Sequence, residues 1–114
     1  MKKNFFLKPD QIRPLTDLPG GAFASDRMVV DGAKVGYMYR EAPDHGSDSG
    51  WRFLAGDESD EYMDNPANFG IYALNIIANY DTEVLPLLNT PPGNAFVRDP
   101  ASGRLIVDDV VPGL

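Results

Sequence analysis

The sequence contains no cysteine among its 114 residues, which excludes disulfides, thiolate metal sites and thiol nucleophiles. Histidine and tryptophan occur once each, as His45 and Trp51. Long apolar runs are also missing. The apolar start of the chain stops at Leu7, short of the roughly 7–15 residues of a signal-peptide core, and no later run approaches the roughly 20 residues that cross a bilayer. We therefore expect a cytoplasmic protein with no membrane partner.

Basic side chains are scarce in the second half of the chain. Residues 1–52 carry eight basic and seven acidic side chains, whereas residues 53–114 carry two basic and ten acidic ones. The formal net charge is −7. Nucleic-acid binding needs Lys and Arg to displace counterions from phosphates, so no nucleic-acid partner is expected. The acidity either attracts a basic protein partner or simply keeps the protein soluble.

The residues that are present predict one α+β domain. The chain is 43% hydrophobic, and at this length it can bury about two thirds of the surface that it exposes when unfolded. We expect a mostly antiparallel sheet of about five strands with two or three short helices. Residues 1–20 are interpreted as an N-terminal entry segment, residues 21–109 as the domain and residues 110–114 as a C-terminal tail.

Alternation of apolar side chains predicts the strands. The expected strands are 22–30, 35–40, 51–55, 95–98 and 104–108. The first two should pair as a hairpin, because Asp31 and Gly32 both tolerate positive φ. The last two should form a second hairpin. A polar loop over 41–50 separates the second and third strands, since its proline and glycines break regular structure.

Helices are predicted between the two hairpins. Residues 57–64 have acidic side chains in a first turn, which complements the helix dipole. Residues 71–80 place Leu74, Ile77 and Ala78 on one face. Asp81 or Thr82 should cap a further short helix that ends near residue 88, and this helix should be irregular because it contains a proline.

An acidic run follows the third strand: Asp57, Glu58, Asp60, Glu61 and Asp64. An EF-hand loop needs Gly at its sixth position and Glu at its twelfth, and neither is present. A looser Mg²⁺ or Ca²⁺ site, a pair of catalytic carboxylates, a solvated helix face and a contact surface for a basic partner all stay open. Acids four apart repel each other on a helix, and Arg40 or Arg52 is expected to offset that repulsion.

Two further patterns suggest catalysis but lack a complete site. In the run from Gly46 to Gly50 the central residue is Asp48, whereas a nucleophile elbow has Ser there. Ser49 and His45 lie in the same polar loop, and a serine nucleophile needs a histidine oriented by a buried carboxylate. The lone histidine also has no partner at a metal-binding spacing. We therefore assign no catalytic residue, no metal site and no cofactor.

Several runs of the sequence together resemble one bacterial family. They are Gly36–Pro43, Asp48–Phe53, Gly56–Glu58, Asp64–Pro66 and Tyr72–Asp81. These runs are similar to the immunity-protein-33 family, a former domain of unknown function grouped with the immunity proteins of polymorphic toxin systems. The resemblance covers roughly residues 20–97. It implies a cytoplasmic protein that binds and neutralises a toxin, and it implies no catalytic residues.

The first hypothesis is therefore a non-catalytic binding protein that occludes a toxin through an acidic surface. The predicted partner-binding residues are Asp44, Asp48, Trp51, Arg52, Asp57, Glu58, Asp60, Glu61 and Asp64. Two alternatives remain. One is a metal-dependent or small-ligand protein that uses the carboxylates of 57–64, and the other is a self-associating interaction domain, so a homo-oligomer is possible.

Overall fold

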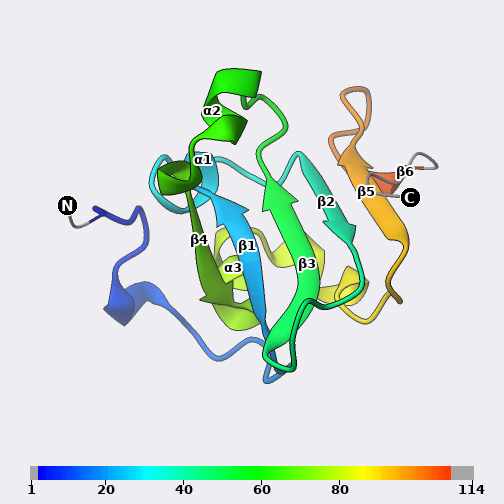
Figure 1. Ribbon diagram of the computed structural model, residues 1–114, viewed down its shortest axis with the longest axis horizontal. Helices are drawn as coiled ribbons and strands as arrows, with labels where there is room; N and C mark the ends of the chain where they lie inside the picture. The colour runs from blue at the N-terminus through cyan, green and yellow to red at the C-terminus, as the bar shows by residue number, and fades with distance from the viewer. Residues whose placement is uncertain (1–2, 109–114) are drawn as a thin grey trace.

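The computed structural model describes residues 3–108, so the predicted tail over 110–114 lies outside the described residues. Twelve short elements follow one another along these described residues (Figure 1). They are η1 (Pro9–Gln11), β1 (Gly21–Ser25), α1 (Asp26–Val29), β2 (Tyr37–Arg40), β3 (Asp48–Leu54), α2 (Asp60–Asp64), η2 (Pro66–Asn68), β4 (Phe69–Ala73), α3 (Leu74–Tyr80), η3 (Thr82–Leu87), β5 (Asn94–Arg98) and β6 (Leu105–Asp108).

Six of these elements form one mixed sheet in the order β4-β1-β3-β2-β5-β6. Strands β1 and β3 are parallel, and the other four neighbouring pairs are antiparallel. The predicted α+β class and the mostly antiparallel sheet are confirmed, with six strands in the sheet. Strand β2, which covers the strand predicted over 35–40, lies inside the sheet between β3 and β5.

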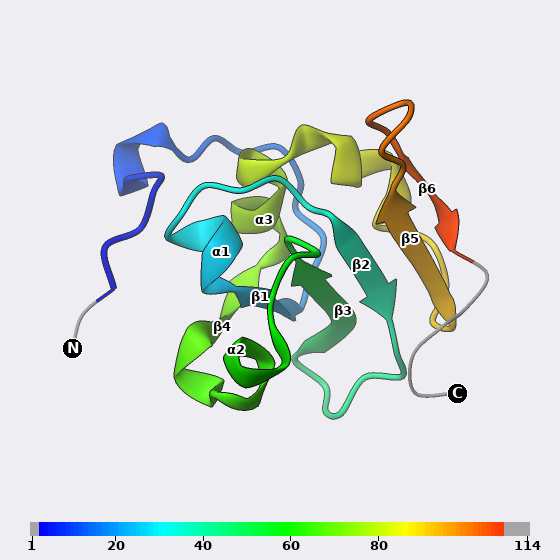
Figure 2. The ribbon, with the colours of Figure 1, turned by 90° about the horizontal axis from the view of Figure 1, so that it is seen from above.

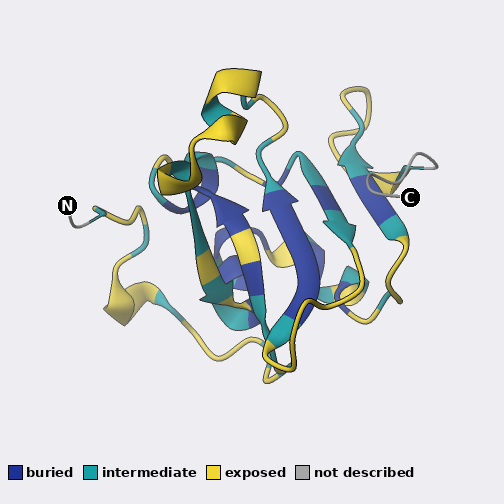
Figure 3. Cartoon of the chain, viewed as in Figure 1, coloured by how far each residue is buried: buried dark blue, intermediate teal, exposed yellow. Residues whose placement is uncertain are grey.

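One face of the sheet carries the hydrophobic core, and helices α1 and α3 with the 3-10 segment η3 cover it (Figure 2). The largest fully buried side chains there are Trp51, Phe53, Met28, Met38 and Ile77. The indole Nε1 of Trp51 donates a hydrogen bond to the Leu88 carbonyl (3.0 Å), which ties the core to the end of η3. Figure 3 shows the buried residues concentrated in the central strands and the helices behind them.

The predicted hairpin over 22–40 is wrong. Strand β1 ends at Ser25, and the chain turns into the one-turn helix α1, whose Met28 and Val29 are fully buried. Burial of these two side chains against the sheet outweighs the weak strand preference of the segment. Asp31 and Gly32 lie in the connection after α1, and β1 pairs with β3 and β4 instead of β2.

The predicted helix over 71–80 begins later than expected. Phe69–Ala73 forms the edge strand β4, which pairs antiparallel with β1, and helix α3 starts at Leu74. The apolar face predicted for this helix is confirmed, since Leu74, Ile77 and Ala78 are buried. Only the helical part of the segment follows the 3.6-residue period, and the strand part alternates with a period of two.

The other predicted elements form near their expected places. Helix α2 is shorter than predicted, because Ser59 caps it by accepting a hydrogen bond from the Tyr62 N–H (3.1 Å). Asp81 caps η3, which contains Pro86 and is a 3-10 helix, as the predicted irregularity implies. The hairpin of β5 and β6 is confirmed. No described helix has the length and apolarity that crossing a membrane requires.

Residues 3–18, called here the N-terminal strap, run along the outside of α3. Asn75 and Asn79, one turn apart on α3, bind the strap backbone with their side-chain amides. Asn75 Oδ1 accepts from the Leu15 N–H (2.7 Å) and the Thr16 N–H (3.1 Å), and Asn79 Oδ1 accepts from the Arg13 N–H (2.9 Å). The strap is thus attached to the helix side of the sheet.

Candidate functional site

The second face of the sheet has no helical layer, apart from α2 at one end (Figure 2). Strand register places alternate side chains of all six strands on it. We call this surface the open face. Its side chains are those of Phe69, Ile71, Phe23, Arg52, Leu54, Tyr37, Tyr39, Ala95, Val97 and Ile106.

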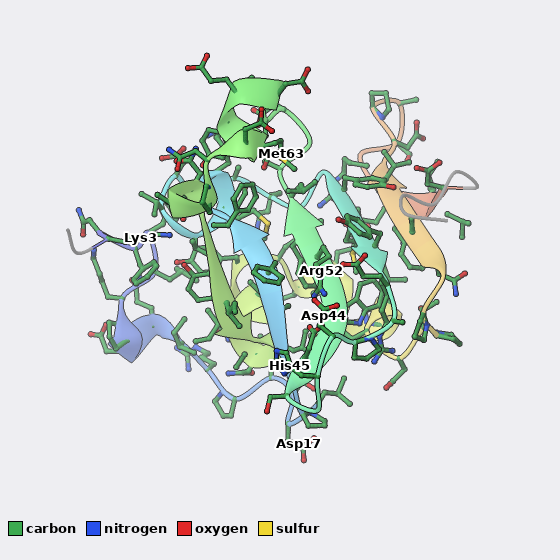
Figure 4. All side chains as sticks on the ribbon, viewed as in Figure 1. Lys3, Asp17, Asp44, His45, Arg52 and Met63 are labelled. Carbon is green, nitrogen blue, oxygen red and sulfur yellow. The ribbon has the colours of Figure 1, made fainter. Side chains whose placement is uncertain are left out.

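The half of the open face next to α2 exposes large apolar side chains. Phe23 is 39% exposed and Ile71 is 64% exposed, and Met63 of α2 overhangs them with 41% exposure (Figure 4). Phe69 completes the group. Two adjoining hollows of about 550 Å³ and 230 Å³ share Phe23, Met63 and Phe69 in their linings. Such a contiguous apolar surface is typical of an interaction site in a protein of this size.

Arg52 lies in the middle of the open face and is only 6% exposed. Its Nε donates to Glu41 Oε2 (2.8 Å), and its two terminal nitrogens donate to the two carboxylate oxygens of Asp48 (2.9 Å each). The guanidinium carbon lies 4.9 Å from the centre of the Phe23 ring. The Arg52 guanidinium holds the pKa of Asp48 well below its usual range, and these carboxylates raise the pKa of Arg52.

The loop before β3 is held against the strand by the same ion pairs. The Glu41 N–H donates to the Gly50 carbonyl (3.0 Å). Gly50 has φ +87°, and a Cβ there would come within 2.2 Å of the Glu41 carbonyl oxygen, so glycine is needed for this close approach. Asp44 extends from the loop with a 74% exposed side chain, 3.8 Å from Arg52 (Figure 4). Its carboxylate is therefore accessible to solvent.

The acidic run divides into structural and free carboxylates. Asp57 pairs with Arg27 (2.6 Å), which lowers the pKa of Asp57. Glu58 accepts hydrogen bonds from Ser25 Oγ (2.5 Å), the Ala55 N–H (2.8 Å) and the Gly56 N–H (2.9 Å). The exposed side chains without an ion pair to any other described residue are Asp60, Glu61 and Asp64.

The arginine expected to offset repulsion within the acidic run is a different one. Arg27 of α1 takes this role, whereas Arg52 binds Asp48 and Glu41. Arg40 points to the core side, where its Nε donates to the Ser49 carbonyl (2.9 Å) and its Nη1 to the Thr90 carbonyl (2.8 Å). The sequence-based expectation for Arg40 and Arg52 was therefore wrong, because alternation along each strand decides which face a side chain reaches.

The predicted partner-binding residues do not form one continuous acidic surface. Asp44 and Asp48 lie at the start of β3, and the free carboxylates of α2 lie beyond its end (Figure 4). The first group contacts Arg52 within β3, whereas α2 begins at Asp60, after β3 has ended at Leu54. Trp51 is 0% exposed and faces the core, so its side chain does not reach this surface.

The polar residues of the 45–49 loop serve the backbone. Ser49 Oγ donates to the Gly21 carbonyl (2.7 Å), and His45 Nδ1 accepts from the Ser47 N–H (3.2 Å), so the histidine does not take the serine proton. Within residues 3–108, no group of three or more His, Asp or Glu side chains is arranged to hold a metal ion. The arrangement is suited to binding by surface contact.

Sequence reasoning found the acidic members of this site but missed the apolar ones. The sequence analysis predicts a helix at Ile71 and no element at Phe69, and it pairs the strand of Phe23 in a hairpin that does not form. The alternation of Phe69 and Ile71 with Gly70 and Tyr72 was the available signal for an edge strand.

Comparison with known families gives a match over most of the chain. The model of the Immunity protein Imm33 domain matches residues 22–107, which include all six strands except the first residue of β1 and the last of β6. The matched region contains the open face and α2, and it leaves out the N-terminal strap. Comparison with the curated proteins and with the solved structures gives no match.

Proposed function

The chain belongs to the Imm33 family of immunity proteins, and on this premise we propose that it neutralises a toxin by binding it and covering its active site, without catalysis of its own. The observation that carries the proposal is the open face, where one side of a six-stranded sheet has no helical cover. Exposed Phe23, Met63 and Ile71 supply the apolar centre that stable protein contacts need.

The charge distribution supports a partner with a basic surface. Asp44 beside Arg52 and the α2 residues Asp60, Glu61 and Asp64 are exposed carboxylates around the open face. Arg52, in the middle of this face, is already paired with Asp48 and Glu41, so it offers little repulsion to a cationic partner. Complementary charge of this kind accelerates the encounter and fixes the orientation of the complex.

The partner can be identified by affinity capture with the tagged protein from a lysate of the strain that produces it. We expect the tagged protein to recover one toxin domain in equimolar amount, and the purified pair to bind with an affinity that falls as salt is raised. Recovery of no toxin under conditions where both genes are expressed would contradict the proposal.

The role of α2 is tested by removing its charge. Asp60→Asn with Glu61→Gln should weaken binding to the captured toxin by about threefold to tenfold, about 0.7–1.4 kcal/mol, and reduce its salt dependence. The matched control is Asp10→Asn with Asp17→Asn, which removes the same charge from the exposed N-terminal strap. Equal effects of the two variants would show that only the overall charge matters.

The two alternatives make different predictions. A metal-dependent protein should bind Mg²⁺, Mn²⁺ or Ca²⁺ in a calorimetric titration, and that binding should disappear when the α2 carboxylates are replaced. A self-associating domain should sediment faster at high concentration than at low concentration. Under the proposed function the free protein sediments at the same rate at both concentrations, and metals do not change its affinity for the toxin.

A further inference from the structure

We propose that the hollow between α2 and the edge of the sheet receives one apolar side chain of the protein partner, and that a Lys or Arg next to it in the partner pairs with Asp64. This inference rests on the proposed function and specifies the chemistry of the contact. The hollow, of about 550 Å³, is lined by Phe23, Met63, Asp64, Pro66, Phe69, Gly70 and Ile71.

The floor of the hollow is apolar and wide enough for a side chain to enter. Ile71 and Phe23 are directly opposite each other in the β1–β4 pairing, so their side chains lie side by side on the open face. Gly70 lies between Phe69 and Ile71 in the edge strand and adds only backbone to the lining, because a Cβ there would point to the other face, toward the Tyr72 ring. A volume of about 550 Å³ is within the usual range of ligand pockets and exceeds that of any single side chain.

The wall of the hollow is held in place before binding. Met63 projects from α2, which is capped by Ser59 and followed by a second cap, where Asn65 Oδ1 accepts from the Ala67 N–H (3.0 Å). The Tyr62 ring packs edge-on against Phe69, with 6.1 Å between the ring centres. Because these contacts already fix α2 over the strand, a partner loses little free energy in ordering the site.

The charge around the hollow favours a cationic residue next to the partner's apolar side chain. Asp64 lines the hollow, is exposed and forms no ion pair with another described residue. Arg52, in the adjoining hollow, is held by Asp48 and Glu41. The unbalanced charge at this end of the open face is therefore negative. A cationic side chain of the partner, next to its apolar side chain, complements this charge.

The proposal is tested with a random peptide library displayed on phage and selected against the full-length protein. We expect the selected peptides to share an apolar residue within one or two positions of Lys or Arg. A synthetic peptide of the selected sequence should shift the methyl signals of Met63 and Ile71 in an NMR titration. Selected peptides without this pattern, or shifts confined to the helix side, would overturn the proposal.

Two substitutions at equally exposed positions show which surface the selected peptide contacts. Ile71→Asp should weaken binding of the selected peptide at least about tenfold. Val107→Asp changes an equally exposed residue, 63% against 64%, which lies on the other face of the opposite edge strand, and should leave binding within about twofold. Equal loss in both variants would contradict the proposal, and the methyl titration of the unaltered protein decides the question if either variant fails to fold.

Asp64 has its own test. Asp64→Asn should reduce the affinity for the basic peptide but not for the same peptide with its Lys or Arg replaced by Gln.

Failure of the proposed contact at the hollow can be separated from failure of the proposed function. If Ile71→Asp binds the captured toxin with unchanged affinity, the hollow is not the contact but the immunity function stands. If the peptide binds at the hollow and no toxin is captured, the proposed function fails while the hollow remains a binding site.

Discussion

At the scale of single residues, the carboxylates of this protein have two separate roles. Asp48 and Glu41 neutralise Arg52 inside the open face, and Glu58 accepts three hydrogen bonds from the ends of β1 and β3. Asp60, Glu61 and Asp64 have no such contacts and extend into solvent. Neighbouring acids of the run from Asp57 to Asp64 therefore differ in role because of the partners that the fold brings to them, such as Ser25 for Glu58.

Asp48→Asn should destabilise the fold. The Asp48 side chain is only 6% exposed and binds Arg52 through both oxygens. Removal of one member of a largely buried pair costs a few kcal/mol, and because Arg52 keeps Glu41 we expect a loss of about 2–3 kcal/mol at pH 7. Urea unfolding measures this loss.

The pH dependence should change in the same variant. The folded-state pKa of Asp48 lies below its unfolded value of about 3.9, so its contribution to stability is present above pH 4–5 and is lost as the pH falls toward the folded pKa. The stability of Asp48→Asn should therefore decline less steeply between about pH 5 and 2 than that of the unaltered protein. Parallel curves for the two proteins would contradict this assignment.

Trp51→Phe should lower stability without changing affinity for the partner. The variant leaves a cavity in the core and removes the indole donor to the Leu88 carbonyl. A loss of about 1–3 kcal/mol is expected in urea unfolding, and toxin binding should stay within about twofold. A large loss of affinity with unchanged stability would instead place Trp51 in the contact surface.

At the scale of elements, the segments that were predicted correctly have one dominant signal each. The β5–β6 hairpin has alternation with a turn between the strands, and α3 has a buried face with a period of 3.6 residues. Residues 22–30 and 69–80 each change from strand to helix within a few residues, at Ser25 and at Ala73. Packing of the new helix on the sheet decides where the change falls, and the short alternation at 69–72 is the one local pattern that precedes it.

The N-terminal strap gives a test at this scale. Asn75→Ala removes the acceptor for the Leu15 and Thr16 N–H groups, so these amides should exchange with solvent faster, while the global stability falls by about 1–2 kcal/mol or less. Asn79→Ala is the matched control, because the side-chain oxygen Oδ1 of Asn79 accepts a hydrogen bond from a different strap amide, the Arg13 N–H. Hydrogen exchange followed by NMR should therefore show a separate set of faster amides in each variant.

At the scale of the whole molecule, the sheet order creates the candidate site. Phe23, Arg52 and Ile71 are distant in sequence, and they lie in one row only because β1 inserts between β3 and β4. The fold class and the family could be predicted from the sequence, and the acidic side chains of the candidate site stay a prediction made from it. The apolar side chains were not predicted, because they depend on a parallel pairing that no spacing reveals and on a short edge strand whose alternation runs directly into a helix.

The central claim is that the open face, and not the helix-covered face, contacts the partner. The most direct measurement is an NMR titration of the isotope-labelled protein with the toxin recovered by affinity capture. The account predicts that the shifted signals cluster at Phe23, Arg52, Met63 and Ile71 and leave α1, α3 and the N-terminal strap unchanged. Shifts concentrated on α3 and the strap, with the open face unaffected, would contradict it.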